Sequence, residues 1–247
     1  VAARAFHLTA RWVRGGHPAS LFAESEKQSL ERRRGLLFAA LERDLGTAAR
    51  PAGPRVERAL RMCANAHGTA LNAARLGRSL GVTYHTARAD VALLESAFLV
   101  RLLPPFDAGR RQRRAPRVYV RDSGLLHALL GIADGHDLLG HPVRAASFSG
   151  LVVESLLAAA EAQRAGYYAT AGGAEAELVL ERGRRRVAVS TSVSSRPAGV
   201  RRGFARAVRD LGAGEAWVVA PIDRAHRLDD ERAEALPLPE AVQRIRS

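Results

Sequence analysis

The sequence predicts an α+β protein in which N-terminal helices and a winged helix-turn-helix precede a compact α/β domain. Three observations support this fold class. Apolar residues recur at helical spacing in the first 45 residues, two short helical segments flank a tight turn at 81–83, and the pattern from residue 149 reads helix, three strands, helix, strand. We therefore expect a helical connector over residues 1–50, a winged-helix domain over 51–145 and an α/β domain over 146–247.

The N-terminal region is expected to hold two helices. Residues 1–14 form the first, which the glycine- and proline-containing run 15–18 ends, and the second extends over 21–45. Its acidic residues come early and its arginines later, as the helix dipole favours. The charged stretch 24–34 is therefore interpreted as a solvated face rather than a binding patch, and residues 47–54 as a linker.

The central region carries the signals of a helix-turn-helix. After a helix over residues 55–67, two shorter helices are expected over 72–80 and 84–97. Gly81 suits the C-terminal cap of the first of these because glycine adopts positive φ at no steric cost. Thr83 suits the N-cap of the second because its hydroxyl can accept a hydrogen bond from the first turn.

Two apolar strands complete the predicted winged helix. They are expected over residues 98–103 and 117–120, which leaves the arginine-rich segment 106–116 as the wing. Asp122 is then expected to cap a short helix that Gly131 ends, and residues 133–146 are expected to form a loop.

The C-terminal region alternates helices and strands. A helix over residues 149–165, stopped by Gly166, precedes strands over 167–170, 177–180 and 187–193, a helix over 201–211 and a strand over 216–219. Past Ile222 the chain is charged and weakly patterned, so no element is predicted there.

Charge favours a nucleic-acid partner. The net charge is +13, the isoelectric point is near 11.3, and Lys27 is the single lysine among many arginines. The alternative is that a GC-rich genome favours arginine and that the charge is dispersed over the surface.

Cysteine content and hydropathy indicate the compartment. Cys63 is the single cysteine, so no intrachain disulfide can form, and its apolar helical context predicts burial. No apolar run is long enough to span a bilayer, and no signal-peptide pattern is present. We therefore expect a cytoplasmic protein with no membrane association.

The helix-turn-helix offers the candidate nucleic-acid interface. Early residues of a second, groove-reading helix contact base edges, and basic residues of a wing contact phosphates. The candidates are Tyr84, His85 and Arg88 on the helix and Arg110, Arg111, Arg113 and Arg114 on the wing. The alternative is that this winged helix serves packing or partner contacts.

The other reactive side chains are interpreted as structural. His136 and His141, with Asp134 and Asp137, resemble loose metal ligands but lack the spacing of a zinc helix, so a local role in the loop is preferred. Ser192 and its neighbouring serines lie in no nucleophile elbow. No metal and no cofactor is predicted.

Several segments resemble the C-terminal region of a bacterial AAA-type ATPase family. Its members carry a P-loop ATPase module, a winged helix and a nuclease-like C-terminal domain of unknown function. The matching segments follow the family's order through nearly the whole chain: GGHP (15–18), LERDL (41–45), LVRLLPP (99–105), PRVYVRDSGL (116–125), LGHP (139–142) and GAEAELVL (173–180). The resemblance implies a restriction-endonuclease-like fold for 146–247 and a remnant of the ATPase lid for 1–50.

The ATPase activity of that family is not expected in this chain. A phosphate-binding P-loop requires a lysine beside the phosphates, within G-x-x-x-x-G-K-[ST]. That motif does not occur in the sequence, and Lys27 lies in no such context. We therefore expect no ATP binding by this chain.

The nuclease motif implied by the resemblance is degenerate. A PD-(D/E)xK core holds Mg²⁺ with clustered carboxylates and places a lysine near the phosphate. The corresponding positions are Ser149, Glu177, Ser190 and Ser192, of which one keeps an ionisable group. We therefore expect no catalytic residues; the alternative is a divergent Mg²⁺-dependent nuclease that uses Glu154, Glu175 and Glu177.

These observations predict a non-catalytic binding or interaction module. DNA is the expected partner, contacted through arginines. The alternatives are the divergent nuclease and a protein-interaction piece that self-associates or binds a separately encoded ATPase.

Overall fold

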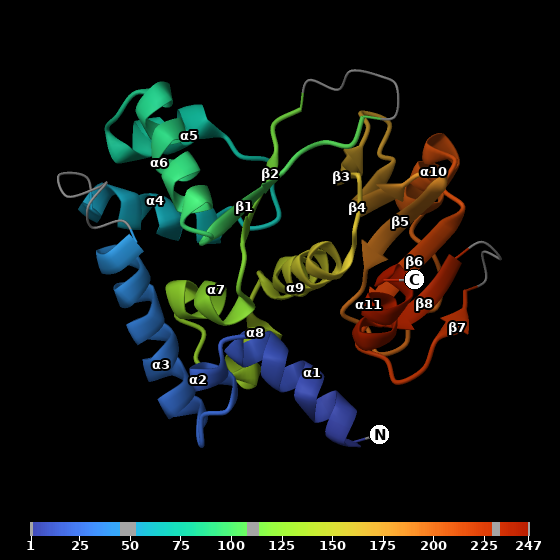
Figure 1. The fold of residues 1–247 in the computed structure, drawn as a ribbon, viewed down its shortest axis with the longest axis horizontal. Coiled ribbons are helices and arrows are strands. Elements are labelled where there is room, and N and C mark those ends of the chain that lie inside the picture. The colour runs from blue at the N-terminus through green and yellow to red at the C-terminus, as the bar shows by residue number, and fades with distance from the viewer. Residues whose placement is uncertain (1, 45–52, 108–113, 229–232, 247) are drawn as a thin grey trace. The chain divides into compact units, whose positions relative to one another are not determined.

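The computed structural model describes residues 2–44, 53–107, 114–228 and 233–246 (Figure 1). Its helices and strands confirm the mixed α+β class. The chain forms two compact units, which we call the helical unit and the sheet unit. The helical unit comprises the described residues of Thr9–Leu102 and Ala115–Gly150, and the sheet unit those of Val1–Leu8, Leu103–Arg114 and Leu151–Ser247.

The helical unit combines helices with one two-stranded sheet, β1-β2. Helix α1 up to Leu8 and helix α9 from Leu151 belong to the sheet unit. The elements in chain order are α1 (Ala2–Arg14), α2 (Pro18–Leu21), α3 (Glu26–Ala39), the π-helix η1 (Ala40–Asp44), α4 (Gly53–Asn65), α5 (Ala73–Leu80), α6 (Tyr84–Ser96), β1 (Val100–Leu103), β2 (Arg117–Val120), α7 (Ser123–Leu130), α8 (Gly135–Gly140) and α9 (Arg144–Ala159).

The single helix expected over 21–45 is wrong. The chain leaves α2 at Phe22 and begins α3 anew, because the Ser25 hydroxyl accepts a hydrogen bond from the Gln28 amide at 3.1 Å and caps the first turn. Helix α3 ends at Ala39, and the residues from Ala40 form the π-helix η1. The predicted linker lies mostly outside the described residues, and α4 begins at Gly53.

The predicted caps of the central helices are confirmed. Gly81 ends α5 with φ +70°, and the Thr83 hydroxyl accepts from the Thr86 amide at 3.1 Å at the start of α6. The Asp122 carboxylate accepts from the Leu125 amide at 2.8 Å, and Gly131 ends α7 with φ +77°. Local chemistry therefore determines where these helices begin and end.

The loop expected over 133–146 contains a short helix instead. The Asp134 carboxylate accepts from the amides of His136 at 2.8 Å and Asp137 at 3.0 Å, which starts α8. Helix α9 begins at Arg144, five residues before the expected start at Ser149, and ends at Ala159.

Leucine, valine and alanine side chains form the core of the helical unit. One apolar cluster joins the inner faces of α4, α5 and α6 to the strands β1 and β2 and to helix α7. Cys63 is buried in this cluster, as predicted, and burial raises the pKa of its thiol to about 12. The thiol is therefore a packing group at neutral pH.

The sheet unit contains a six-stranded mixed sheet. The strand order is β3-β4-β5-β6-β8-β7; β3, β4 and β5 are antiparallel, β6 is parallel to β5 and β8, and β7 is antiparallel to β8. The elements are β3 (Arg164–Ala169), β4 (Glu175–Arg182), β5 (Arg185–Thr191), α10 (Arg202–Leu211), β6 (Glu215–Ala220), β7 (His226–Arg227), β8 (Ala233–Pro237) and α11 (Leu238–Arg246).

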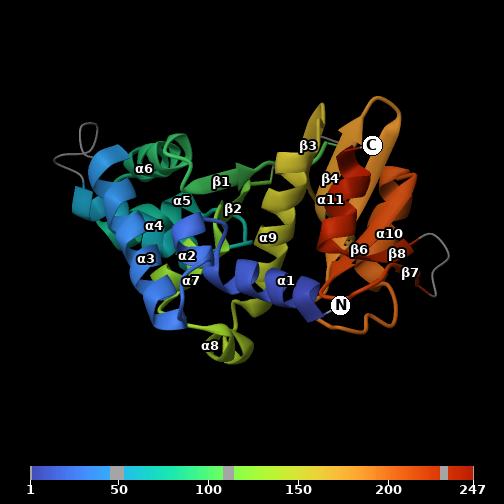
Figure 2. The same cartoon turned by 60° about the horizontal axis from the view of Figure 1, so that its bottom comes forward.

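Helices cover the sheet. Helix α10 contacts β4 and β5, and α11 contacts β6 and β8 (Figure 2). Phe204, Ala207, Val208 and Leu211 of α10 are buried because they recur at helical spacing on one side of the helix. They pack against alternate residues of the strands, such as Ala188 of β5.

Two C-terminal predictions are wrong. Gly166 does not stop a helix; it lies in β3, where an added Cβ would lie 2.7 Å from the Pro104 carbonyl oxygen, so glycine permits close approach of the two chain segments. The chain past Ile222 also contains β7, β8 and α11. These pair with or pack on the sheet, and their short apolar runs are too brief to be recognised from the sequence alone.

Candidate nucleic-acid interface and the Glu177 site

Helix α6 presents one face to the core and another to solvent. Ala87, Val91 and Leu94 recur at intervals of three and four residues and are buried. Tyr84 and Arg88, one turn apart, lie on the exposed side, where the tyrosine is 45% exposed. His85 is also exposed. The structure therefore brings the three candidates on α6 together at its N-terminal end.

The exposed residues of α6 contact one another. The guanidinium carbon of Arg88 lies 5.7 Å from the ring centroid of Tyr84, and the Tyr84 and His85 rings meet edge to face at 5.4 Å. Arg88 also lies 3.5 Å from the Tyr84 hydroxyl, a long hydrogen bond. We call Tyr84, His85 and Arg88 the α6 cluster. Its guanidinium can donate to phosphate oxygens or to a guanine edge.

A partly buried ion pair joins α4 to α6. Arg55 of α4 donates to both carboxylate oxygens of Asp90, at 2.8 and 3.0 Å, and the Asp90 side chain is only 5% exposed. The hydrogen bond to Asp90 raises the pKa of Arg55. This pair was not predicted from the sequence. The signal that could have revealed it is Asp90, an acidic residue on the otherwise apolar face of the expected helix.

The predicted wing is only partly described. Arg110, Arg111 and Arg113 lie outside the described residues, while Arg114 is described and exposed. Two further exposed arginines, Arg75 and Arg78, lie on α5 and were not singled out from the sequence. The role of the wing residues therefore stays a prediction.

In the sheet unit, the one acidic residue left at a nuclease-motif position is paired with an arginine. Glu177 on β4 has a side chain that is 12% exposed, and Arg201, the N-cap residue of α10, donates to its Oε1. The same Nη2 atom of Arg201 donates to the Ser190 hydroxyl on β5 at 2.9 Å. The structure thus brings Glu177 and Ser190 together around a guanidinium that sequence reasoning did not consider.

Burial and the ion pair act in opposite directions on Glu177. Burial is the larger cause and raises the pKa of its carboxyl, and the charge and hydrogen bond of Arg201 lower it. The second carboxylate oxygen, Oε2, is buried with no hydrogen-bond partner among the described residues. The guanidinium supplies the positive charge that a carboxylate in this environment requires.

The other two nuclease-motif positions are Ser192 and Ser149. Ser192 follows β5, and its hydroxyl accepts from the Ser194 amide at 3.2 Å. Ser149 belongs to the helical unit, where it is buried and its hydroxyl has no hydrogen-bond partner in the described part of the chain. Within those described ranges, no three His, Cys, Asp or Glu side chains are grouped to hold a metal ion.

The histidines and aspartates near residue 137 have local roles. Asp134 caps α8, the Asp137 carboxylate accepts from the Ala133 amide at 3.0 Å, and His141 Nδ1 accepts from the Val143 amide at 3.1 Å. These bonds account for the side chains of Asp134, Asp137 and His141, while His136 contributes its backbone amide to the cap of α8.

A buried arginine corrects the interpretation of the charged N-terminal helix. Arg33 of α3 is 0% exposed and donates to backbone carbonyls, including those of Ala133 at 2.7 Å, Ser29 at 3.3 Å and Val13 at 3.4 Å. Burial lowers its pKa. Its neighbours in sequence are exposed, as expected of a solvated face. Arg33 instead joins α3 to the segment before α8.

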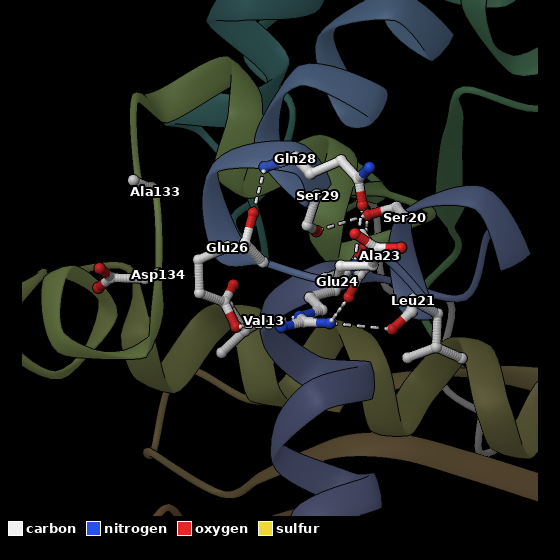
Figure 3. A network of polar contacts seen from close by, with 12 residues as sticks. Val13, Ser20, Leu21, Ala23, Glu24, Glu26, Gln28, Ser29, Ala133 and Asp134 are labelled. Atoms are coloured by element: carbon white, nitrogen blue, oxygen red, sulfur yellow. Dashed lines mark hydrogen bonds and ion pairs between the residues drawn. The ribbon is translucent and has the colours of Figure 1, made fainter.

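Arg14 extends the same network, which Figure 3 shows from close by. Its guanidinium donates to Glu26 at 2.7 Å and to the carbonyls of Leu21 at 3.2 Å and Ala23 at 2.7 Å. These bonds hold the turn between α2 and α3. The network is structural because its donors are satisfied by backbone acceptors and one carboxylate.

Fold and site together define a mixed α+β protein with an exposed aromatic and basic cluster and an acidic position closed by an arginine. No helix among the described residues combines the length and the apolar character needed to cross a membrane. Residues 5–135, more than half of the chain, match the family described as a domain of unknown function, DUF8612. The chain belongs to this family.

Similar proteins are known from mycobacteria. The uncharacterized protein Rv2008c of Mycobacterium tuberculosis and the uncharacterized protein Mb2031c of Mycobacterium bovis are each 37% identical to the chain over 222 residues. The match covers 89% of this chain and 50% of each relative, so the chain spans about half the length of these relatives. No solved structure matches the chain.

Proposed function

We propose that the chain is a non-catalytic nucleic-acid-binding module whose helices α5 and α6 act as a winged helix-turn-helix on DNA. The supporting observation is the α6 cluster, in which Tyr84, His85 and Arg88 are exposed together at the start of the second helix. That end of a recognition helix is the part that approaches base edges in the major groove. Arg75 and Arg78 of α5 would add contacts to phosphates.

The proposal also assigns the sheet unit a binding or structural role, as a nuclease-like fold that has lost its chemistry. The pairing of Glu177 with Arg201 supports this assignment. A catalytic Mg²⁺ is held by clustered carboxylates, whereas Oε1 of Glu177 already accepts from the Arg201 guanidinium, whose positive charge would repel the ion. The proposal concerns this chain alone and not the activity of the full-length relatives, because the match covers half of their length.

A salt titration with two matched arginine variants tests the proposal. Arg88→Ala and Arg61→Ala each remove one exposed positive charge, but Arg61 lies on α4 and pairs with Glu57 at 2.9 Å. We expect Arg88→Ala to weaken binding to a mixed-sequence duplex and to lower the salt slope by about 0.9, the value for one lost phosphate contact. Arg61→Ala should change neither quantity. Equal effects of the two variants would show that the charge acts without a specific face.

A divergent nuclease is the outcome that would replace the proposal. Plasmid nicking in the presence of Mn²⁺ measures it. Nicking that disappears in Glu177→Ala and persists in Arg88→Ala would identify the sheet unit as an active enzyme.

Self-association is the second candidate, because α3 and the end of α2 each carry one exposed phenylalanine. Phe38 of α3 is 63% exposed and Phe22, at the end of α2, is 75% exposed. A hollow of about 480 Å³ between α2 and α3 has Ala19, Gly35, Leu36 and Ala39 in its lining, together with the polar Gln28, Glu31 and Arg32. A second copy could place its own Phe38 in this hollow, as a two-fold contact requires. Light scattering on the intact protein and on Phe38→Ala measures this; a monomer in both cases excludes it.

A further inference from the structure

Phe98 combines two unfavourable features. It is the single non-glycine residue with positive φ among the described residues, at +58°, and it is 73% exposed. Bulky side chains are disfavoured at positive φ because Cβ approaches the backbone oxygen. An exposed phenylalanine ring is also costly in water. A residue of this kind is a candidate for function.

The end of α6 imposes the unusual backbone at this position. The Leu99 amide donates to the Leu94 carbonyl and the Phe98 amide to the Glu95 carbonyl, both at 3.0 Å. This is the Schellman arrangement, in which the residue at the place of Phe98 is normally glycine. Leu94 and Leu99 are buried in the core of the helical unit, which holds the turn in place. Glycine would satisfy the turn, so the turn does not explain the phenylalanine.

The ring of Phe98 is held by an arginine. The guanidinium carbon of Arg121 lies 5.1 Å from the ring centroid, a cation–π contact. The Arg121 amide donates to the Leu99 carbonyl at 3.1 Å, so the backbones that carry the two side chains are also joined. The pair thus presents an exposed aromatic ring beside a positive charge.

We propose that Phe98 and Arg121 form a stacking site for an unpaired base of single-stranded nucleic acid. The ring offers a π-face to a base of any sequence, and the guanidinium can bind the adjoining phosphate. The net charge of +13 favours a polyanion over an uncharged or basic ligand. This inference shares with the proposed function only the assumption that the partner is a nucleic acid.

The site is distinct from the α6 cluster. Helix α6 has 13 residues, so at about 1.5 Å per residue its two ends lie roughly 20 Å apart. Tyr84 marks one end and Phe98 follows the other. A duplex bound at the first end and an unpaired base bound at the second can therefore be measured separately.

Fluorescence of 2-aminopurine tests the stacking site. The probe is a short oligothymidine with one central 2-aminopurine, whose emission falls when the base stacks. We expect the intact protein to quench it, and Phe98→Ala to bind at least about fivefold more weakly, the lower end of what one stacked base contributes. Phe98→Trp should retain both affinity and quenching, because tryptophan stacks as well as phenylalanine does.

Two variants exclude trivial explanations. Phe98→Gly removes the ring and suits the turn, so backbone strain cannot cause a loss of affinity in this variant. Leu139→Ala truncates another exposed apolar side chain of the helical unit, 62% exposed on α8, and should bind the probe like the intact protein. Affinity within twofold of the intact protein for both Phe98→Ala and Phe98→Gly would overturn the proposal.

A blunt duplex separates this proposal from the proposed function. We expect Phe98→Gly to bind the duplex normally and Arg88→Ala to bind it weakly. If Arg88→Ala has this effect while Phe98→Gly still binds the oligothymidine, the stacking site alone is wrong. If the intact protein binds the oligothymidine through Phe98 but no duplex, the proposed function is wrong and the stacking site stands. Conversion of an oligomer to a monomer by Phe98→Gly, with unchanged oligothymidine binding, would assign Phe98 to a protein contact instead.

Discussion

Removal of the Arg201 side chain should lower the free energy of unfolding, because the Glu177 carboxylate is then buried without a cation. Arg201→Ala leaves the Glu177 side chain, 12% exposed, without its cation and with Oε2 already lacking a partner. Breaking a fully buried pair costs about 3–5 kcal/mol. The Arg201 side chain is 61% exposed, so solvent screens part of this interaction and we expect a loss of about 1–3 kcal/mol. No helix cap is lost, because the Arg201 side chain makes no capping bond to α10.

The pH dependence of the loss identifies its cause. Burial raises the pKa of Glu177, so the folded state retains this proton to higher pH than the unfolded chain does. The stability that Glu177 contributes through its raised pKa is therefore fully present below the pKa of this carboxyl in the unfolded chain. It is lost as the pH rises through the pKa of the carboxyl in the folded protein. Without Arg201 the pKa rises further, so Arg201→Ala should approach the stability of the intact protein at about pH 4, below the ordinary carboxyl pKa, and differ most at about pH 8.

Urea denaturation at these two pH values measures the effect, and Glu177→Gln provides the control. The neutral amide removes the titrating group while it keeps the shape of the side chain. The double variant with both changes should be more stable than Arg201→Ala alone at the higher pH, because no buried charge remains. A loss that is the same at both pH values, or a double variant no better than Arg201→Ala, would refute the reasoning.

Three further predictions concern the helical unit. Phe98→Gly should be more stable than Phe98→Ala by about 0.5–1 kcal/mol in thermal unfolding, since both lose the ring and only glycine relieves the positive φ; equal stability would contradict the strain. Arg55→Ala should lower the free energy of unfolding by about 1–3 kcal/mol, because Asp90 is left buried and unpaired while Arg55 itself is partly exposed. The same variant should weaken duplex binding. Arg55→Lys should recover part of the stability and part of the binding. Burial lowers the pKa of His67 to about 3 and of His127 to about 4, so their contribution to stability is full above the unfolded pKa near 6.5 and should fall by up to about 1.4 kcal/mol per pH unit per histidine below it; His127→Gln should reduce this acid slope.

Local chemistry explains which parts of the fold were predictable. Gly81 and Thr83 mark helix ends through bonds within four residues, and these ends were placed correctly. The break before α3 depends on the Ser25 hydroxyl within a long charged stretch, where the pattern continues without interruption. The last strands and α11 owe their stability to pairing with β6 and β8. Propensity alone cannot reveal elements that form because a partner is already present.

The candidate sites show the same division. The α6 cluster was predictable because helical spacing alone brings Tyr84 and Arg88 to one face. Arg201 was not, because its acceptors Glu177 and Ser190 lie on two strands, 24 and 11 residues away in sequence, respectively. Arg33 was misjudged for a similar reason: carbonyls up to 100 residues distant satisfy its donors. Nothing in an arginine's immediate neighbours reports such contacts.

Some arginines have structural roles, and others supply the excess positive charge of the chain. Arg33 is buried among carbonyls, while Arg55 and Arg201 neutralise carboxylates that need them. A neutral pair contributes nothing to the net charge of +13, so the excess comes from arginines without a matching acid. Arginine use imposed by composition alone would leave that excess dispersed. At the two ends of α6, guanidinium groups lie over exposed aromatic rings, with Arg88 over Tyr84 and Arg121 over Phe98. In the sheet unit, Arg164 and Arg186 also lie over a ring, but that ring belongs to the buried Phe106. The two contacts at α6 differ because their rings are exposed, and an exposed ring beside a guanidinium is the combination that the proposed nucleic-acid contacts require.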